Sequence, residues 1–416
     1  MAGEVNLSST LNNTTLQTLP TTQLVYVLLH VQPTGTGVAT QTALNFGLVL
    51  DRSGSMSGTN IQNLRSAVKQ ILGRMGPQDL VSLVVFDDKV DVLVPSQPVT
   101  NPAQLQGQVD QITDRGGTEM SKGIRKGLEQ IRAGATPDRN SHMILLTDGE
   151  TWGDEEVCKE LATECAQAGI SISAFGLGNE WNQELLEAIA HNSNGNANYL
   201  ERPESIGIEF ERTLSSVQNT TITNANLTLR LVQGVTPRTA WRVVPQISML
   251  DARNLSERDI QLNLGDLEAG TGQSVLVELV MPPRNAGTFR IAQAEVSYDV
   301  PSAGLIGERE RQDIILNLTD DPAQVQPLNP QVMNLVEKVS VFKLQTRALS
   351  EAQAGNIGKA TQQLRVAATR LLEMGEADLA QAAQEEVASL EQQGAMTSAG
   401  TKKLHYGTRK LTQRLD

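Results

Sequence analysis

Short apolar runs and segments of helical periodicity alternate between residue 44 and about residue 217. The runs are nearly continuous in apolar character, which is typical of strands covered on both faces of a parallel sheet. This alternation predicts a doubly wound, mainly parallel, Rossmann-like α/β domain at 41–217. The run VDVLVP (90–95) follows the second strand so closely that we expect one antiparallel edge strand there. The expected strands are LNFGLVL (44–50), LVSLVVF (80–86), HMILLT (142–147), ISISAFGLG (170–178) and ANYL (197–200), and the expected helices are 60–75, 119–132, 155–168 and 183–191.

From residue 218 to about residue 320 the hydrophobic period changes to two. Segments such as ANLTLRLV and SVLVELVMP alternate apolar and polar side chains, with Gly, Pro and Asn between the segments. This pattern predicts an antiparallel β-sandwich at 218–320 whose sheets each have one wet face. The strand pattern QLVYVLLHVQP (23–33) stands alone before the α/β region and needs a sheet to join. We therefore expect residues 1–40 to contribute a strand to the sandwich, with the α/β domain inserted into it.

After the Pro-marked linker DDPAQVQPLNP the composition becomes rich in Ala, Leu and Gln. Three helical patterns, with breaks at Gly355, Gly375 and Gly394, predict a small α-helical domain at 328–394. The last segment, 395–416, is polar and basic. We expect it to be a disordered tail.

Length and composition limit the classes of function. The chain has 416 residues, too many for one core and enough for two or three domains. Its formal charge of −13 and its 3% aromatic content disfavour nucleic acid as a partner, because phosphates repel such a charge and base stacking needs aromatic rings. The start of the chain lacks the features of a secretory signal, and no run approaches the roughly 20 apolar residues of a membrane span. We therefore expect a cytoplasmic protein without membrane insertion.

Small polar side chains follow the expected strands at one edge of the α/β sheet. Asp51, Ser53 and Ser55 come directly after the first strand, in the sequence LVLDRSGSM. Thr118 lies on a Gly-Gly loop that opens a helix, and Asp148 follows the strand HMILLT. Open α/β sheets bind ligands outside the carboxyl ends of their strands. Two acids and three hydroxyls form a hard-oxygen site that suits Mg²⁺, and also Mn²⁺ or Ca²⁺.

The motifs DRSGSM, GGT and TDGE, in this order and at these separations, resemble the metal-ion-dependent adhesion site (MIDAS) of von Willebrand factor type A (VWA) domains. The resemblance implies the VWA fold, with all five coordinating positions present. It implies that Ser53, Ser55 and Thr118 coordinate the cation directly when a ligand acid is bound, whereas Asp51 and Asp148 then act largely through waters. It also implies that an Asp or Glu of a protein partner completes the coordination.

We expect a protein-interaction scaffold rather than an enzyme. The site has no His, Cys or Lys placed as a nucleophile or base, and Ser53 and Ser55 would be used as metal ligands. The four histidines are scattered over different elements, at His30, His142, His191 and His405. Two alternatives stay open. One is a metal-dependent hydrolase, for which Glu119 or Glu150 could supply the base; the other is a purely structural VWA protein whose acids only cap helices.

The tail contains a near-repeat, GTKKL followed by GTRKL. Thr401 and Thr408 each precede two basic residues and a Leu at +3, a pattern that predicts phosphorylation by a Ser/Thr kinase. Forkhead-associated domains are a family that reads phosphothreonine and the +3 residue, and the tail is similar to such a docking peptide. The alternative is a chance near-repeat. A role in a signalling system with a Ser/Thr kinase and a phosphothreonine reader is therefore a hypothesis.

The multi-domain plan is similar to that of bacterial members of the VWA family, and we therefore expect a bacterial protein.

Overall fold

The computed structural model describes residues 4–34, 42–136 and 139–413, and the chain forms two compact units. One, the α/β unit, consists of Gly37–Thr221 and Pro301–Leu305. The other, the sandwich–helix unit, consists of Met1–Thr36, Ile222–Val300 and Ile306–Asp416. None of the described helices has the length and apolar character of a membrane span.

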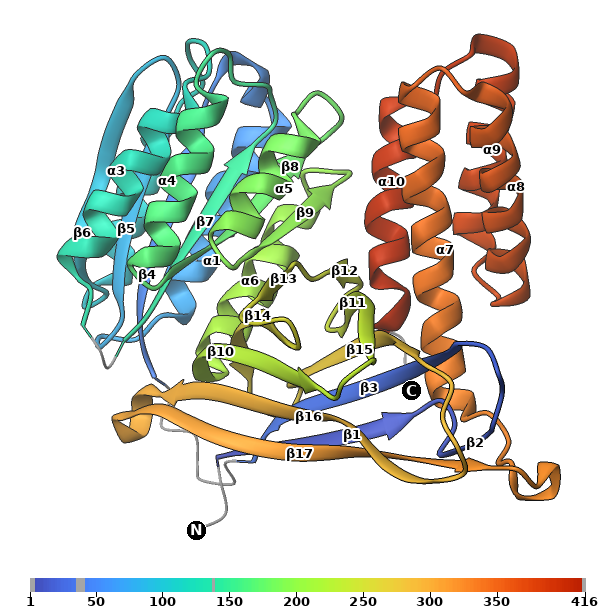
Figure 1. The fold of residues 1–416 in the computed structure, drawn as a ribbon. Helices are drawn as coiled ribbons and strands as arrows, with labels where there is room; N and C mark the ends of the chain where they lie inside the picture. Colours follow the sequence, from blue (N-terminus) through green and yellow to red (C-terminus); the bar gives the residue numbers. More distant parts are fainter. Residues whose placement is uncertain (1–3, 35–41, 137–138, 414–416) are drawn as a thin grey trace. The chain divides into compact units, whose positions relative to one another are not determined.

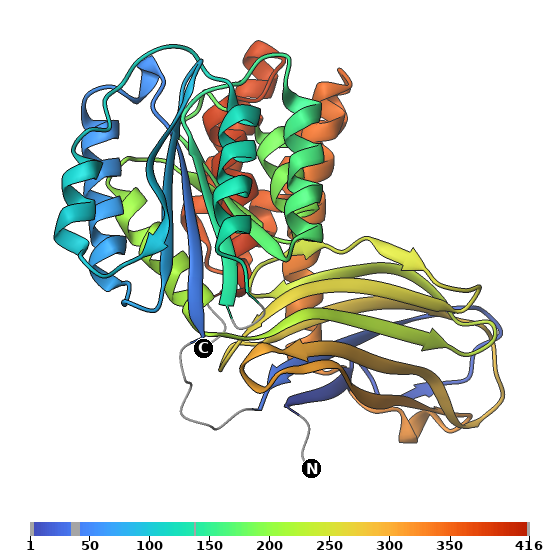
Figure 2. The same ribbon diagram turned by 90° about the vertical axis from the view of Figure 1, so that its left-hand side faces the viewer.

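The α/β unit is built on one sheet, whose described strands lie in the order β6-β5-β4-β7-β8-β9 (Figures 1 and 2). Neighbouring strands run parallel except for β5 and β6, which form the antiparallel edge pair. The prediction of a mainly parallel sheet with one antiparallel edge strand is confirmed. The strands are β4 (Ala43–Asp51), β5 (Leu80–Phe86), β6 (Val90–Pro98), β7 (Arg139–Thr147), β8 (Ile170–Leu177) and β9 (Asn196–Leu200).

Helices cover both faces of this sheet, which is why its central strands are apolar throughout. On β4, Leu48 and Leu50 pack into one core with α1, α2 and α6, whereas Val49 packs into the other with α3, α4 and α5. Gly47 allows a close approach of α3, since a Cβ at this position would lie 2.5 Å from Cδ1 of Ile131. The helices are α1 (Thr59–Arg74), α2 (Pro102–Val109), α3 (Met120–Ala133), α4 (Glu155–Gln167), α5 (Gln183–Asn192) and α6 (Ser205–Gln218).

His142 on β7 makes the stability of this unit depend on pH. Its ring stacks on Phe46, with centroids 5.8 Å apart, and its Nε2 lies 3.0 Å from Oγ of Ser173. Burial lowers the pKa of His142 to about 4 from its ordinary 6.5. The unfolded chain therefore binds a proton first as the pH falls below about 6.5, and the free energy of unfolding should drop by roughly 3 kcal/mol by the time the pH reaches about 4.

A His142→Phe variant should remove this part of the acid sensitivity, because phenylalanine cannot titrate. Urea unfolding of both proteins at about pH 7 and about pH 4.5 measures the effect. Protonation of carboxylates destabilises both proteins in acid. The informative quantity is therefore how much more unfolding free energy the wild type loses between the two pH values than the variant does. Equal losses in the wild type and the variant would show that His142 does not contribute.

The sandwich–helix unit begins with two packed sheets. Their described strands have the orders β1-β3-β15-β11-β12 and β13-β14-β10-β16-β17-β2. β3 pairs antiparallel with both β1 and β15, so the N-terminal segment is part of the sandwich, and the α/β residues are inserted between β3 and β10. We expected one strand from this segment, whereas it supplies three. The strands are β1 (Val5–Leu11), β2 (Thr15–Gln17), β3 (Gln23–Pro33), β10 (Thr220–Leu231), β11 (Thr236–Val244), β12 (Ser248–Met249), β13 (Ala252–Asn254), β14 (Asp259–Glu268), β15 (Gln273–Met281), β16 (Gly287–Val300) and β17 (Leu305–Thr319).

Helices cover part of the outer face of the first of these sheets. Leu28 and Leu276 share a core with α7, and the rings of Trp241 and Phe342 lie 6.0 Å apart. The face that we expected to be wet is therefore partly covered by the helical region, whereas Asn6 and Ser8 on β1 stay exposed. The C-terminal α-helical domain is present, with four described helices where we expected three: α7 (Pro330–Gln353), α8 (Ile357–Glu373), α9 (Ala377–Gln393) and α10 (Ser398–Arg409) (Figure 1).

The prediction of a disordered tail at 395–416 was wrong for residues 395–413, because most of them form the packed helix α10; residues 414–416 lie outside the described residues. Thr397 caps the helix by accepting a hydrogen bond from the backbone N of Gly400 at 3.0 Å. Glu386 on α9 accepts a hydrogen bond from the backbone N of Thr397 at 2.7 Å and so ties the two helices together. Leu404 and Leu411 are buried in the core of the helical domain. The capping and these contacts stabilise a helix whose sequence is mostly polar.

The structure also contradicts the predicted phosphorylation sites. Thr408 is fully buried, and its hydroxyl donates to the carbonyl O of Leu404 at 2.7 Å. A phosphate there would have to enter a packed interface without solvent. Thr401 is half-buried in the first turn of α10, where its backbone N bonds to the O of Thr397 at 3.0 Å. The basis for a kinase and a forkhead-associated partner at an exposed tail is therefore lost.

Candidate metal centre

The loop after β4 brings together the first three predicted ligands. β4 ends at Asp51, whose side chain is buried. Asp51 Oδ1 accepts a hydrogen bond from the backbone N of Ser53 at 2.7 Å, and this local bond turns the chain out of the strand. A short 3-10 helix, η1 (Gly54–Met56), follows and places Oγ of Ser55 3.1 Å from Oγ of Ser53.

The other two predicted ligands reach the same point from separate loops. Ser55 Oγ donates to Oδ1 of Asp148, directly after β7, at 2.6 Å. Thr118 precedes α3, and its Oγ1 lies 3.9 Å from the position that a Cβ on Gly149 would occupy. That position is also 3.8 Å from Oγ of Ser55. The five predicted side chains therefore converge at the carboxyl edge of the sheet.

Burial and charge at this point suit a cation. Burial raises the pKa of Asp51 to about 6, against the hydrogen bonds from Thr147 and Ser53, and burial also raises the pKa of Asp148. Two desolvated carboxylates beside one another are costly, and a divalent ion offsets that cost. The hydroxyl side of the cluster is open, since Ser55 is exposed and Thr118 is half-buried. A hard divalent cation fits these oxygens, and a ligand could approach it from solvent.

Imidazole and thiolate ligands do not contribute to this centre. In the part of the chain that the structure describes, three or more His, Cys, Asp or Glu side chains are nowhere grouped as a metal site. Both cysteines are buried and free, and burial raises the pKa of Cys165 to about 12. The donor set is therefore two carboxylates and three hydroxyls, which excludes a soft-metal site of the cysteine type here.

Two residues that support the ligands were missed in the sequence. Thr147 donates from Oγ1 to Oδ2 of Asp51 at 2.6 Å. Asn60, in the first turn of α1, donates from Nδ2 to Oδ2 of Asp148 at 3.3 Å. Each acid thus has one side-chain donor outside the predicted set, which orients its carboxylate. Thr147 is adjacent to Asp148 in the sequence, but Asn60 carries no local signal of this role.

A network of ion pairs lies beneath the loops of the centre. Asp87, fully buried at the end of β5, accepts from Nε of Arg52 at 2.7 Å and from Nε of Arg115 at 2.8 Å. Asp91 on β6 pairs with both arginines, at 2.7 Å to Arg115. Burial acts to raise the pKa of Asp87, but the hydrogen bonds from Arg115, the Lys89 backbone and Arg52 outweigh it and lower that pKa to about 2.

Backbone hydrogen bonds beside these ion pairs connect two of the loops that carry predicted ligands. Arg115 N donates to the O of Arg52 at 2.8 Å, and Glu119 N donates to the O of Asp87 at 2.8 Å. Gly116, between them, has φ +71°, and a Cβ there would lie 2.4 Å from Oδ1 of Asp88. The loop that carries Thr118 is therefore held against the loop that carries Ser53 and Ser55 by charge and by backbone geometry.

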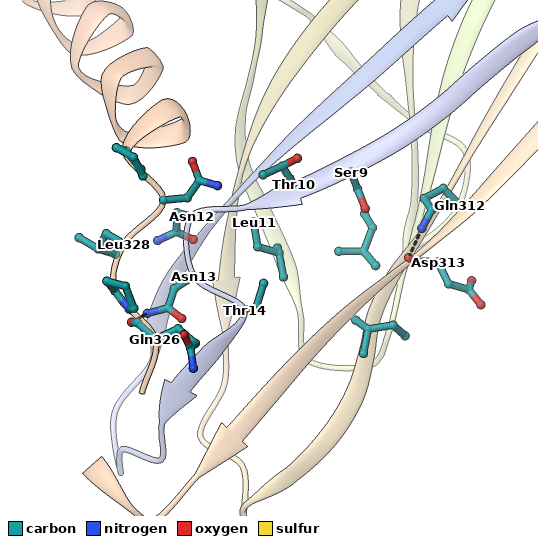
Figure 3. A pocket seen from close by; sticks show the side chains of 15 residues that line it. Ser9, Thr10, Leu11, Asn12, Asn13, Thr14, Gln312, Asp313, Gln326 and Leu328 are labelled. Atoms are coloured by element: carbon teal, nitrogen blue, oxygen red, sulfur yellow. Dashed lines mark hydrogen bonds between the residues drawn. The ribbon is translucent and has the colours of Figure 1, made fainter. Parts of the chain in front are cut away.

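A groove in the sandwich–helix unit is a weaker candidate for a functional site. It lies between β1, β17 and the linker before α7, with a volume of about 520 Å³ (Figure 3). Its amides serve the fold: Asn13 donates to the O of Gln326 at 2.7 Å, and Asn12 accepts from the N of Tyr26 at 2.9 Å. Asp313 alone among the lining residues is charged. The groove thus lacks a cluster of reactive groups.

Comparison with known proteins agrees with the fold. The model of the von Willebrand factor type A domain matches residues 45–210, and that of the Sll0103-like, C-terminal alpha-helical domain matches residues 330–414. The uncharacterized protein sll0103 of Synechocystis sp. is 30% identical over 314 residues, which cover 74% of this chain and 71% of that protein. The chain belongs to the family of Sll0103-like VWA domain proteins. The predicted VWA domain is confirmed.

More distant relatives share parts of the chain or the fold alone. Inter-alpha-trypsin inhibitor heavy chain H3 of Rattus norvegicus is 29% identical over 195 residues, 44% of this chain but only 22% of the heavy chain. A solved von Willebrand factor type A protein from Catenulispora acidiphila has a TM-score of 0.77 at 17% identity, covering 98% of this chain and 96% of that one. The ArnB paralog VWA2 from Sulfolobus acidocaldarius has a TM-score of 0.57 at 14% identity, covering 99% of each chain.

Proposed function

We propose that this protein is a non-enzymatic interaction module that binds a partner through a divalent cation. Asp51, Ser53, Ser55, Thr118 and Asp148 would hold the cation. A bound cation would supply an open coordination position for an Asp or Glu carboxylate of the partner protein. The observation that carries the proposal is the convergence of these five oxygen-bearing side chains from three loops at one point.

Mg²⁺ is the cation that we propose, because the donors are hard oxygens and only two of them carry charge. Mn²⁺ and Ca²⁺ accept the same donors and are the expected competitors. Binding rather than hydrolysis is supported by the groups around the centre. Glu119, one of the two candidate bases, is paired with Lys122, and His142 is buried against Phe46. A hydrolase would need a free base beside the metal.

A pull-down from the native host tests the proposed function. The full-length protein should capture a partner in Mg²⁺ and release it in chelator, and Asp51→Ala should capture none. Asp110→Ala is the matched control, because Asp110 is an exposed acid of the same unit that pairs with Lys69. Capture that is equal in chelator, or equal for Asp51→Ala, would contradict the proposal. Metal-dependent hydrolysis of p-nitrophenyl phosphate that Asp51→Ala abolishes would instead favour the hydrolase.

A further inference from the structure

The loop between β7 and α4 carries the most exposed tryptophan of the chain. Trp152 is 79% exposed, whereas Trp181 is 2% and Trp241 is 7% exposed. Within the described residues, the indole of Trp152 makes no hydrogen bond or ring contact, and so it adds nothing evident to the fold. Tryptophan is the side chain that most often dominates protein interfaces, because its burial removes a large apolar area from water.

The position of Trp152 beside the metal centre is fixed by the residue before it. Thr151 Oγ1 donates to the carbonyl O of Thr118 at 3.2 Å and accepts from the backbone N of Met120 at 3.2 Å. Asp154, two residues after Trp152, accepts from the backbone N of Ser121 at 2.8 Å. The loop on both sides of Trp152 is therefore tied to the segment that carries a predicted ligand.

The chain itself limits how far Trp152 can lie from the centre. A Cβ added to Gly149 would lie 3.8 Å from Oγ of Ser55 and 3.9 Å from Oγ1 of Thr118, so Gly149 is beside these two hydroxyls. Only Glu150 and Thr151 lie between Gly149 and Trp152, which allows at most about 11 Å between the Cα atoms of Gly149 and Trp152. Trp152 and Ser55 are both exposed and lie on loops that follow the neighbouring parallel strands β7 and β4, so both are at the carboxyl edge of the sheet.

We propose that Trp152 is the specificity-determining residue of the metal centre, and that it selects a carboxylate carried next to a large apolar group. In a protein partner this is an Asp or Glu flanked by an aromatic or long aliphatic side chain. The cation binds the carboxylate, and the indole covers the apolar group and excludes water from it. This inference rests on the proposed function, because it needs a cation that accepts a carboxylate.

Two small carboxylates test the inference without knowledge of the partner. Acetate supplies the carboxylate alone, and 3-phenylpropionate adds an aromatic ring. With the full-length protein in saturating Mg²⁺, titrations observed by ligand NMR should show 3-phenylpropionate binding roughly three- to tenfold tighter than acetate, the range of one aromatic contact. Trp152→Ala should bind the two probes equally and keep its affinity for acetate and for Mg²⁺. Trp152→Phe should recover most of the preference.

The control variant is Ile306→Ala, which removes an apolar side chain that is 84% exposed and lies outside this loop. It should leave the preference unchanged. Equal binding of both probes by the wild type, or a preference that survives Trp152→Ala, would overturn the role of Trp152 and leave the proposed function standing. Failure of both probes to bind in Mg²⁺ would contradict the proposed function itself, and the inference with it.

Discussion

Replacing Asp148 with alanine is expected to weaken Mg²⁺ binding by at least about 100-fold, the upper end of the losses seen when one group that supports a bound metal is removed. Asp148 supplies one of the two formal charges of the centre and anchors Ser55. The fold should survive, because burial disfavours the charged form of Asp148 and its loss relieves that cost. We expect the metal-free variant to be within about 1 kcal/mol of the wild type in its free energy of unfolding.

Isothermal titration calorimetry with MgCl₂ measures the affinity, and urea unfolding in chelator measures the stability. Asp110→Ala serves again as the control, because it removes an exposed acid from the same unit. It should bind Mg²⁺ like the wild type. An Asp148→Ala protein that keeps its Mg²⁺ affinity would show that the cation, if any, binds elsewhere.

Replacing Asp87 with alanine is expected to cost about 3–5 kcal/mol of unfolding free energy, the usual effect of leaving a buried charge without its partner. Arg52, whose side chain is only 4% exposed, would lose its buried partner and keep only the half-exposed Asp91. Asp91→Ala is the matched control, because Asp91 contacts the same two arginines but its side chain is 47% exposed. It should cost only about 0–1 kcal/mol.

Urea unfolding of the two variants at neutral pH separates these outcomes. If both substitutions lower the unfolding free energy by the same amount, the burial of Asp87 does not determine the contribution of its ion pairs to stability. The Asp87 carboxylate has a pKa of about 2 in the folded protein, below its ordinary 3.8. Its contribution is therefore present above about pH 4 and is lost as the pH falls towards about 2, so the difference between the wild type and Asp87→Ala should shrink in strong acid.

The sheet of the α/β unit was predictable because burial on both faces leaves an almost unbroken apolar run. β4 shows this, with Leu44, Phe46, Leu48, Val49 and Leu50 all fully buried. β1 was missed because VNLSSTL mixes serines and threonines with few apolar residues. It pairs with β3, which is itself far in the sequence from most of the other strands of the sandwich. Pairing of that kind is decided by tertiary contacts, not by local pattern.

Helix α10 was missed for a related reason. Its buried face includes Lys402, His405 and Thr408, which a hydrophobic pattern counts as polar. The helix is stable because Thr397 and Glu386 satisfy its first turn and because it packs on the other helices. None of these contacts can be seen in a window of sequence. The same holds for the short helix α2, which buries only Leu105 and Val109.

The candidate site also has a part that the sequence predicts and a part that it does not. The five proposed ligands lie in short motifs at the ends of strands, so the topology of a parallel sheet brings them together. The residues that hold the loops in place are different, because Asn60, Asp87 and Arg115 act across loops whose contacts depend on the folded backbone. Trp152 had no sequence signal at all; only its exposure beside the centre distinguishes it.

Anomalous diffraction from crystals grown with Mn²⁺ would show directly whether these three loops bind one divalent cation. We expect a single strong peak beside the hydroxyls of Ser53, Ser55 and Thr118, with the carboxylates of Asp51 and Asp148 around it. The same experiment on the Asp51→Ala/Asp148→Ala protein should show no peak there. An empty centre in the wild type, or a peak at any other place in the chain, would show that these loops do not hold the cation.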